Sequence, residues 1–129
     1  MAKTFRQMVG EAREQVEVLS PQQAQERMQQ NPNAVVIDVQ EPDDFAAAGA
    51  IPGSINVPLG MLPIRADNEL PEAMRDARLK DRDAPVITTC AGGGQAALAA
   101  KTLKDMGFTN VSMVDGGRRG WKAAGMPTD

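Results

Sequence analysis

Residues 85–95, PVITTCAGGGQ, place one cysteine and three consecutive glycines between a predicted strand and a predicted helix. Residues 85–89 are uncharged and rich in β-branched side chains, which is typical of a strand covered on both faces of a parallel sheet. From 95 to 106 apolar side chains recur at helical spacing, and Gly107 follows as a C-terminal cap. The stretch therefore predicts a strand–loop–helix unit with Cys90 at the carboxyl end of its strand.

The flanking sequence alternates strand and helix patterns. Strands are predicted at 16–19, 34–39, 54–57, 85–89 and 111–114, and helices at 4–15, 21–30, 43–48, 71–79, 95–106 and around Trp121. Thr4 and Ser20 are the expected N-caps of the first two helices. This alternation indicates an α/β fold around a mostly parallel sheet. We assign residues 1–15 to an N-terminal helical extension and residues 16–129 to one domain.

Composition excludes several classes of protein. A net charge of −3 and an aromatic content of 3% argue against binding to nucleic acid. With no histidine and one cysteine, the chain cannot build a Cys–His dyad, a histidine metal site or an internal disulfide, so no metal or cofactor is predicted. No apolar run reaches the length of a membrane span, and no signal peptide is evident, so we expect a soluble, cytoplasmic protein without a membrane partner.

The loop after Cys90 has the composition of an anion cradle. Gly92, Gly93 and Gly94 allow several backbone N–H groups to converge on one point, and the helix beginning near Gln95 directs its positive end there. These groups would stabilise a thiolate, so Cys90 can act as a nucleophile without a histidine. Two alternatives stay open, because a lone cysteine is often a small buried hydrophobe and a glycine triplet can be a flexible turn. The spacing fits neither a phosphate P-loop nor a dinucleotide motif.

Three motifs resemble those of single-domain rhodaneses, a family of sulfurtransferases. They are IDVQEP at 37–42, GAIPGSIN at 49–56 and CAGGGQ at 90–95. Residues 106–111 and 116–121 also match the C-terminal part of the family's sequence pattern, so the resemblance extends over about residues 16–127. It implies a rhodanese-like domain at 16–129, with a five-stranded, mostly parallel sheet flanked by helices on both faces.

The resemblance implies a sulfurtransferase in which Cys90 accepts sulfane sulfur and passes the resulting persulfide on. The expected donor is a small sulfur-containing anion such as thiosulfate, or a persulfide, and the acceptor is a thiol or cyanide. The loop that binds the substrate or persulfide would consist of Ala91, Gly92, Gly93, Gly94 and Gln95. A related phosphatase branch carries an arginine where Ala96 stands here, so phosphatase activity is not expected. The sequence identifies no protein partner.

The chain departs from the family pattern at three basic or titratable positions, which are neutral here. Gln95 and Gln40 stand where the resemblance expects arginine, and Ala50 stands where it expects histidine. The change at Gln95 matters most, because a guanidinium fork suits a dianion. Arg118 and Arg119 are candidates to supply the missing charge, although they can equally form a solvated helix start.

Two further residues have assigned roles. Asp38 is a supporting residue, expected to tether loop backbone at its strand end rather than to transfer protons. Trp121 is expected in the core. The alternative function is a catalytically weak binding or thiol-sensing module of the rhodanese type. The neutral loop favours that module, whereas the intact Cys90 and its glycines favour the enzyme.

Overall fold

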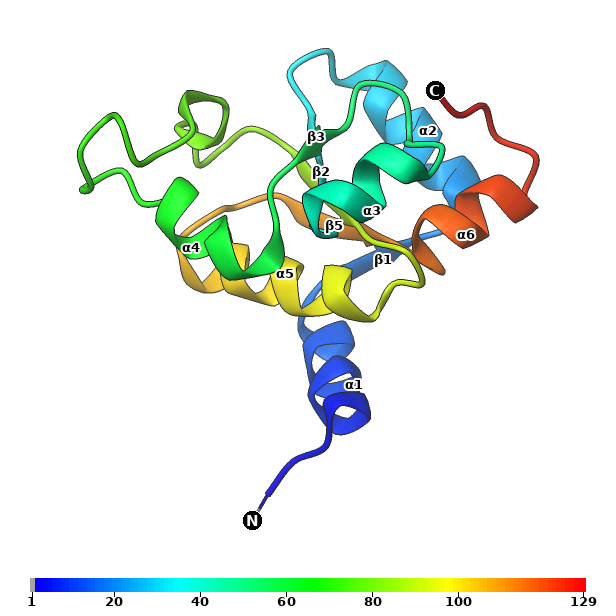
Figure 1. Ribbon diagram of the computed structural model, residues 1–129, viewed down its shortest axis with the longest axis horizontal. Coiled ribbons are helices and arrows are strands. Elements are labelled where there is room, and N and C mark those ends of the chain that lie inside the picture. The colour runs from blue at the N-terminus through cyan, green and yellow to red at the C-terminus, as the bar shows by residue number, and fades with distance from the viewer. Residues whose placement is uncertain (1) are drawn as a thin grey trace.

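A parallel sheet lies between two layers of helices in the computed structural model, which describes residues 2–129 (Figure 1). Its strands are β1 (Glu17–Leu19), β2 (Val35–Asp38), β3 (Ile55–Asn56), β4 (Val86–Thr89) and β5 (Val111–Val114). Their order across the sheet is β1-β5-β4-β2-β3, and every neighbouring pair is parallel. The predicted five-stranded α/β fold is confirmed, with β4 in the centre.

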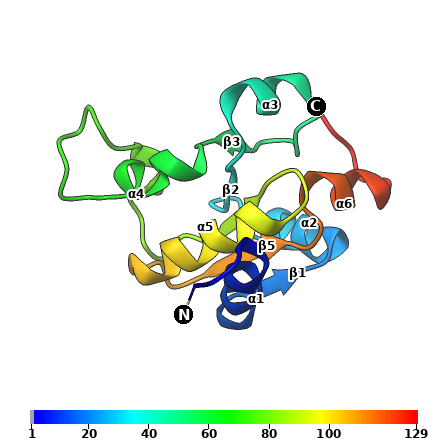
Figure 2. The same cartoon turned by 60° about the horizontal axis from the view of Figure 1, so that its bottom comes forward.

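Helices cover both faces of the sheet. On one face lie α1 (Phe5–Gln15), α4 (Leu62–Arg65) and α5 (Gly94–Asp105), and on the other lie α2 (Pro21–Gln30) and α6 (Gly117–Ala123) (Figures 1 and 2). The short helix α3 (Pro42–Ala47) follows β2 at the carboxyl ends of the strands. Within residues 2–129, no helix has both the length and the apolar character needed to cross a bilayer.

The core is divided by the sheet into two clusters. Val86 and Cys90 contribute to the cluster under α5, whereas Ile87 points to the opposite cluster, as the two-residue period of a strand requires. Trp121 is 1% exposed in that second cluster, and its Nε1–H donates to the carbonyl of Pro127 at 2.7 Å. The predicted core position of Trp121 is therefore confirmed.

The first two helices begin as the sequence predicts. Thr4 Oγ1 accepts from the backbone N–H of Gln7, and the Gln7 side chain accepts from the backbone N–H of Thr4. Ser20 and Gln23 form the same reciprocal pair at the start of α2. Each capping box satisfies two of the helix's free N–H groups, which fixes where α1 and α2 start.

The predicted helix at 71–79 is wrong. This segment forms a turn at 72–74 and a 3-10 helix at Ala77–Leu79, and α4 lies earlier, at Leu62–Arg65. The segment is held by Arg65, whose guanidinium donates to the Met74 carbonyl at 2.6 Å and whose own carbonyl accepts from the backbone N–H of Asp76 at 2.8 Å. These long-range hydrogen bonds replace helical ones, and helical periodicity does not predict them.

Candidate active site

Cys90 lies directly after the central strand β4, and its side chain is 2% exposed. Its Sγ accepts hydrogen bonds from the backbone N–H groups of Gly93 at 3.0 Å and Ala96 at 3.3 Å. Both donors belong to the start of α5, where the helix dipole is positive. Hydrogen bonds to an anionic acceptor are roughly twice as strong as neutral ones, so this environment stabilises negative charge on the sulfur.

The loop reaches this geometry through Gly93. Gly93 caps α5 with φ of 104°, a left-handed conformation that side chains with a Cβ resist. The neighbouring loop residues Ala91 and Gly94 are half-buried, whereas Gly92 and Gln95 are exposed. The structure thus brings the glycine loop and the sulfur together, and it places Gln95 on the exposed side of the first turn of α5.

The turn before α6 packs against the Cys90 loop. The backbone N–H of Arg118 donates to the Cys90 carbonyl at 2.7 Å, and that of Arg119 donates to the Ala91 carbonyl at 3.0 Å. Gly117, the first residue of α6, is buried against the same loop. Sequence reasoning did not assign this role to Gly117, although the Gly116–Gly117 pair was a visible turn signal.

Both arginines line a hollow of about 340 Å³ beside the loop, together with Gln40, Asp44, Ala47, Ala48 and Ala91. An ideal Cβ on Gly92 would lie 3.6 Å from Arg119 Nη1, so that guanidinium runs along the loop. Arg118 is half-buried, and its buried Nε has no hydrogen-bond partner among the described residues. The hollow therefore places two cations next to the loop, with the Asp44 carboxylate also in its lining.

Asp38 is fully buried at the end of β2, where its backbone lies in register with Thr89 of the neighbouring strand β4. Its carboxylate accepts from the backbone N–H of Gln40 at 3.0 Å and from Gln40 Nε2 at 3.1 Å. Burial raises the pKa of Asp38, while the hydrogen bonds from Gln40 and the charge of Arg118 act in the opposite direction. Asp38 thus holds Gln40 in the wall of the hollow.

Asn56 is a second support of this wall that sequence reasoning missed. Its Nδ2 donates to the carbonyls of Asp38 at 3.1 Å and Gln40 at 2.8 Å. Asn56 ends the motif at 49–56, which was the available signal, but the contact itself depends on β3 lying beside β2. In residues 2–129, no three His, Cys, Asp or Glu side chains come together in a way that could hold a metal ion.

Residues 20–124 match the profile of the Rhodanese-like domain. The chain belongs to this family. The thiosulfate sulfurtransferase GlpE of Ectopseudomonas mendocina is 37% identical over 105 residues, which cover 81% of this chain and 84% of the relative. The GlpE protein of Pseudomonas putida is 33% identical over the same proportions of both chains. The resemblance to rhodaneses seen in the sequence is confirmed.

Two solved structures extend the comparison. A Rhodopseudomonas palustris protein of unknown function, described as a possible tyrosine phosphatase, has a TM-score of 0.90 at 31% identity and covers 100% of this chain and 96% of its own. The polysulfide-sulfur transferase homodimer of Wolinella succinogenes has a TM-score of 0.74 at 31% identity, covering 97% and 86%. These two solved structures that resemble this chain are thus described with two different activities, possible tyrosine phosphatase and polysulfide-sulfur transferase.

Proposed function

We propose that this rhodanese-family chain is a sulfurtransferase that carries sulfane sulfur on Cys90. The observation that carries the proposal is the pair of backbone N–H groups, from Gly93 and Ala96, that donate to Cys90 Sγ. Donors that are already in place need no reorganisation when charge on the sulfur develops. The named activity of the GlpE relatives supports the same chemistry.

With thiosulfate as the donor, the reaction proceeds in two displacements. The Cys90 thiolate attacks the outer sulfur, an S–S bond to Sγ forms, and sulfite leaves with the electron pair of the broken S–S bond. A thiolate or cyanide acceptor then attacks the terminal sulfur of the persulfide. The products are an acceptor persulfide or thiocyanate, and Cys90 returns as a thiolate. The loop from Ala91 to Gln95 surrounds the sulfur through both steps.

Capture of the dianion is assigned to Arg118 and Arg119. Their side chains line the hollow beside Ala91, and the buried Nε of Arg118 has no partner in the described chain. These two guanidinium groups supply the positive charge that the loop lacks, because Gln95 is neutral and can only donate neutral hydrogen bonds. Asp38 supports the site by fixing Gln40 in the opposite wall.

Phosphatase activity is not favoured, despite the description of the Rhodopseudomonas palustris structure. Ala96, at the position where the phosphatase branch carries its arginine, is fully buried, and its backbone N–H donates to Cys90 Sγ. The loop itself therefore carries no arginine at that position. The alternative of a weakly active binding or thiol-sensing module differs from the enzyme in one respect, which is whether the persulfide turns over.

The proposed organisation is a rhodanese-like domain at 16–129 preceded by a helical extension at 1–15. The family match at 20–124 begins after α1, which supports this division. Action in the cytoplasm is part of the proposal, because a single free thiol that must accept and release sulfur persists best in a reducing compartment.

The decisive experiment is mass spectrometry after incubation with thiosulfate. We expect Cys90 to gain the mass of one sulfur atom, and cyanide to remove it with release of thiocyanate. Cys90→Ser is the control and should gain nothing. A wild-type protein that forms no persulfide would overturn the proposal, and a persulfide that forms once but is not passed to cyanide or a thiol would favour the sensing module.

A further inference from the structure

Helix α1 lies before the residues that match the family profile, yet it contacts the loop around Cys90. An ideal Cβ on Gly94 would lie 2.8 Å from Cζ and 3.1 Å from Cε2 of Phe5, so the aromatic ring rests directly on the Gly94 backbone. Val9 lies behind it, with Cγ2 at 3.6 Å from the same point. Gly94 stands between Gly93 and Ala96, whose N–H groups donate to Cys90 Sγ.

The rest of α1 is fixed to the domain, so Phe5 is presented by an anchored helix. Ala12 is fully buried in the core cluster under α5. At the end of α1, the Gln15 carbonyl accepts from Lys104 Nζ at 2.6 Å, and Arg13 pairs with Asp115 at 3.2 Å. α1 is therefore anchored through its middle and its end, while its start, at Phe5, meets the start of α5.

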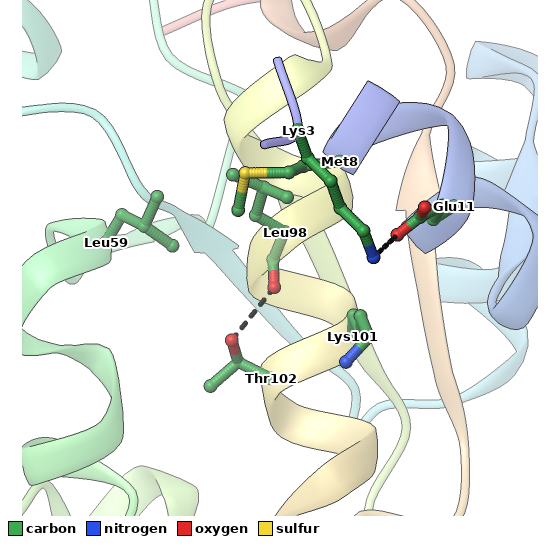
Figure 3. A pocket seen from close by; sticks show the side chains of 7 residues that line it. All are labelled: Lys3, Met8, Glu11, Leu59, Leu98, Lys101 and Thr102. Carbon is green, nitrogen blue, oxygen red and sulfur yellow. Dashed lines mark hydrogen bonds and ion pairs between the residues drawn. The ribbon is translucent and has the colours of Figure 1, made fainter. Parts of the chain in front are cut away.

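One turn beyond Phe5, α1 and α5 border a hollow of about 500 Å³. Figure 3 shows Met8 beside Leu98, with Leu59 across the hollow. The lysines at its rim are neutralised within the chain, because Lys3 pairs with Glu11 and Lys101 pairs with Asp105. The hollow thus has no unbalanced charge that selects a ligand, and the distinctive contact of α1 is the one between Phe5 and Gly94.

We propose that Phe5 is a positioning residue for the Cys90 cradle. Its ring presses on Gly94 and opposes fraying of the first turn of α5, so that the N–H groups of Gly93 and Ala96 stay directed at the sulfur. Helix ends open more readily than helix interiors, and Gly94 has no side chain of its own that could hold the first turn of α5 in place. The contribution of Phe5 to sulfur transfer rests on the proposed function, whereas its hold on the loop does not.

The test is amide hydrogen exchange by NMR on the full chain without substrate, comparing wild type with Phe5→Ala. We expect exchange at Gly93 and Ala96 to accelerate about tenfold in the variant, while exchange in the centre of β4, at Ile87, stays unchanged. Phe5→Leu should fall between the two, because it keeps part of the contact. Met8→Ala is the matched control, since Met8 is an exposed apolar residue of the same helix, 44% exposed against 58% for Phe5, and borders the hollow rather than the loop.

Turnover provides the second readout. Phe5→Ala should lower kcat for sulfur transfer several-fold with little change in the thiosulfate KM, because Arg118 and Arg119 approach the loop from α6. The proposal would be overturned if exchange at Gly93 and Ala96 were unchanged in Phe5→Ala, or if exchange at Ile87 accelerated equally. It would also be overturned if exchange in the loop became faster while kcat stayed unchanged. If wild type forms no persulfide, the proposed function fails, while the exchange comparison still decides whether Phe5 holds the loop.

Discussion

Gly117 lies against the carbonyl group of Cys90 with no room for a side chain between them. An ideal Cβ on Gly117 would lie 2.5 Å from the Cys90 carbonyl oxygen and 2.8 Å from the backbone nitrogen of Gly93. Gly117 also has φ of 61°, in the left-handed region. The turn before α6 and the loop after β4 are therefore one packed unit, in which the start of α6 contacts the loop backbone and the start of α5 contacts the Cys90 sulfur.

We expect Gly117→Ala to disrupt this unit. The left-handed conformation alone costs about 1–2 kcal/mol for a residue with a Cβ, and the close approach to backbone atoms adds about 1–3 kcal/mol. Gly125→Ala is the matched control, because Gly125 also has positive φ but nothing lies within 4 Å of its ideal Cβ. Urea unfolding should show the larger loss for Gly117→Ala, together with loss of sulfur transfer. Equal losses for the two variants would contradict the packed unit.

Replacement of Arg118 tests the source of positive charge. Arg118→Gln should raise the thiosulfate KM about five- to thirtyfold, which corresponds to the loss of about 1–2 kcal/mol of charge-assisted hydrogen bonding, with a smaller effect on kcat. Lys122→Gln removes the same charge from an exposed position on α6 outside the hollow, and should leave KM unchanged. Steady-state kinetics with cyanide as acceptor measure both. Matching KM values for the two variants would exclude Arg118 from substrate capture.

Local sequence signals predicted most of the framework. Capping residues marked the starts of α1 and α2, and β-branched runs marked β2 and β4, because these features depend on neighbours in the chain. The motif at 90–95 predicted a loop that would curl around Cys90, and hydrogen bonds from Gly93 and Ala96 to its sulfur are present in the structure.

Contacts between distant segments could not be predicted in this way. Phe5 meets Gly94, and Gly117 meets Cys90, only because α1 and α6 are brought to the loop by the sheet order. The error at 71–79 has the same origin, since Arg65 organises that segment through hydrogen bonds to Met74 and Asp76, which lie well beyond its own helical turn. In each case one side chain or one missing Cβ decides the contact, and no periodicity accompanies it.

Asp38 should give the stability a distinct pH dependence. Because burial raises its pKa above the ordinary value of 3.8, the folded state holds this proton more tightly than the unfolded state. The stabilisation is fully present below that ordinary value and is lost as pH rises through the raised one. In Asp38→Asn, which keeps an acceptor for the Gln40 N–H, this loss should be absent.

Urea unfolding of wild type and Asp38→Asn, measured from about pH 3.5 to 7, checks the prediction. The difference in free energy of unfolding should shift steadily in favour of the variant as pH rises. Glu26→Gln serves as a control on an exposed carboxylate. A difference between wild type and Asp38→Asn that is independent of pH, or that shifts in favour of wild type, would contradict the effect of burial.

Gln95→Arg restores the charge at the position where the family resemblance expects it. Gln95 is exposed in the first turn of α5, so solvent screens an added guanidinium, and we expect the thiosulfate KM to fall only about three- to tenfold at low salt. The gain should shrink at high salt, and Gln95→Lys should gain less because it lacks the planar fork. In the Arg118→Gln background the same substitution should recover part of the lost affinity, because both guanidinium groups serve one anion. Steady-state cyanide-coupled kinetics at two ionic strengths measure all of these variants, and no gain from Gln95→Arg in either background would show that thiosulfate does not bind at the start of α5.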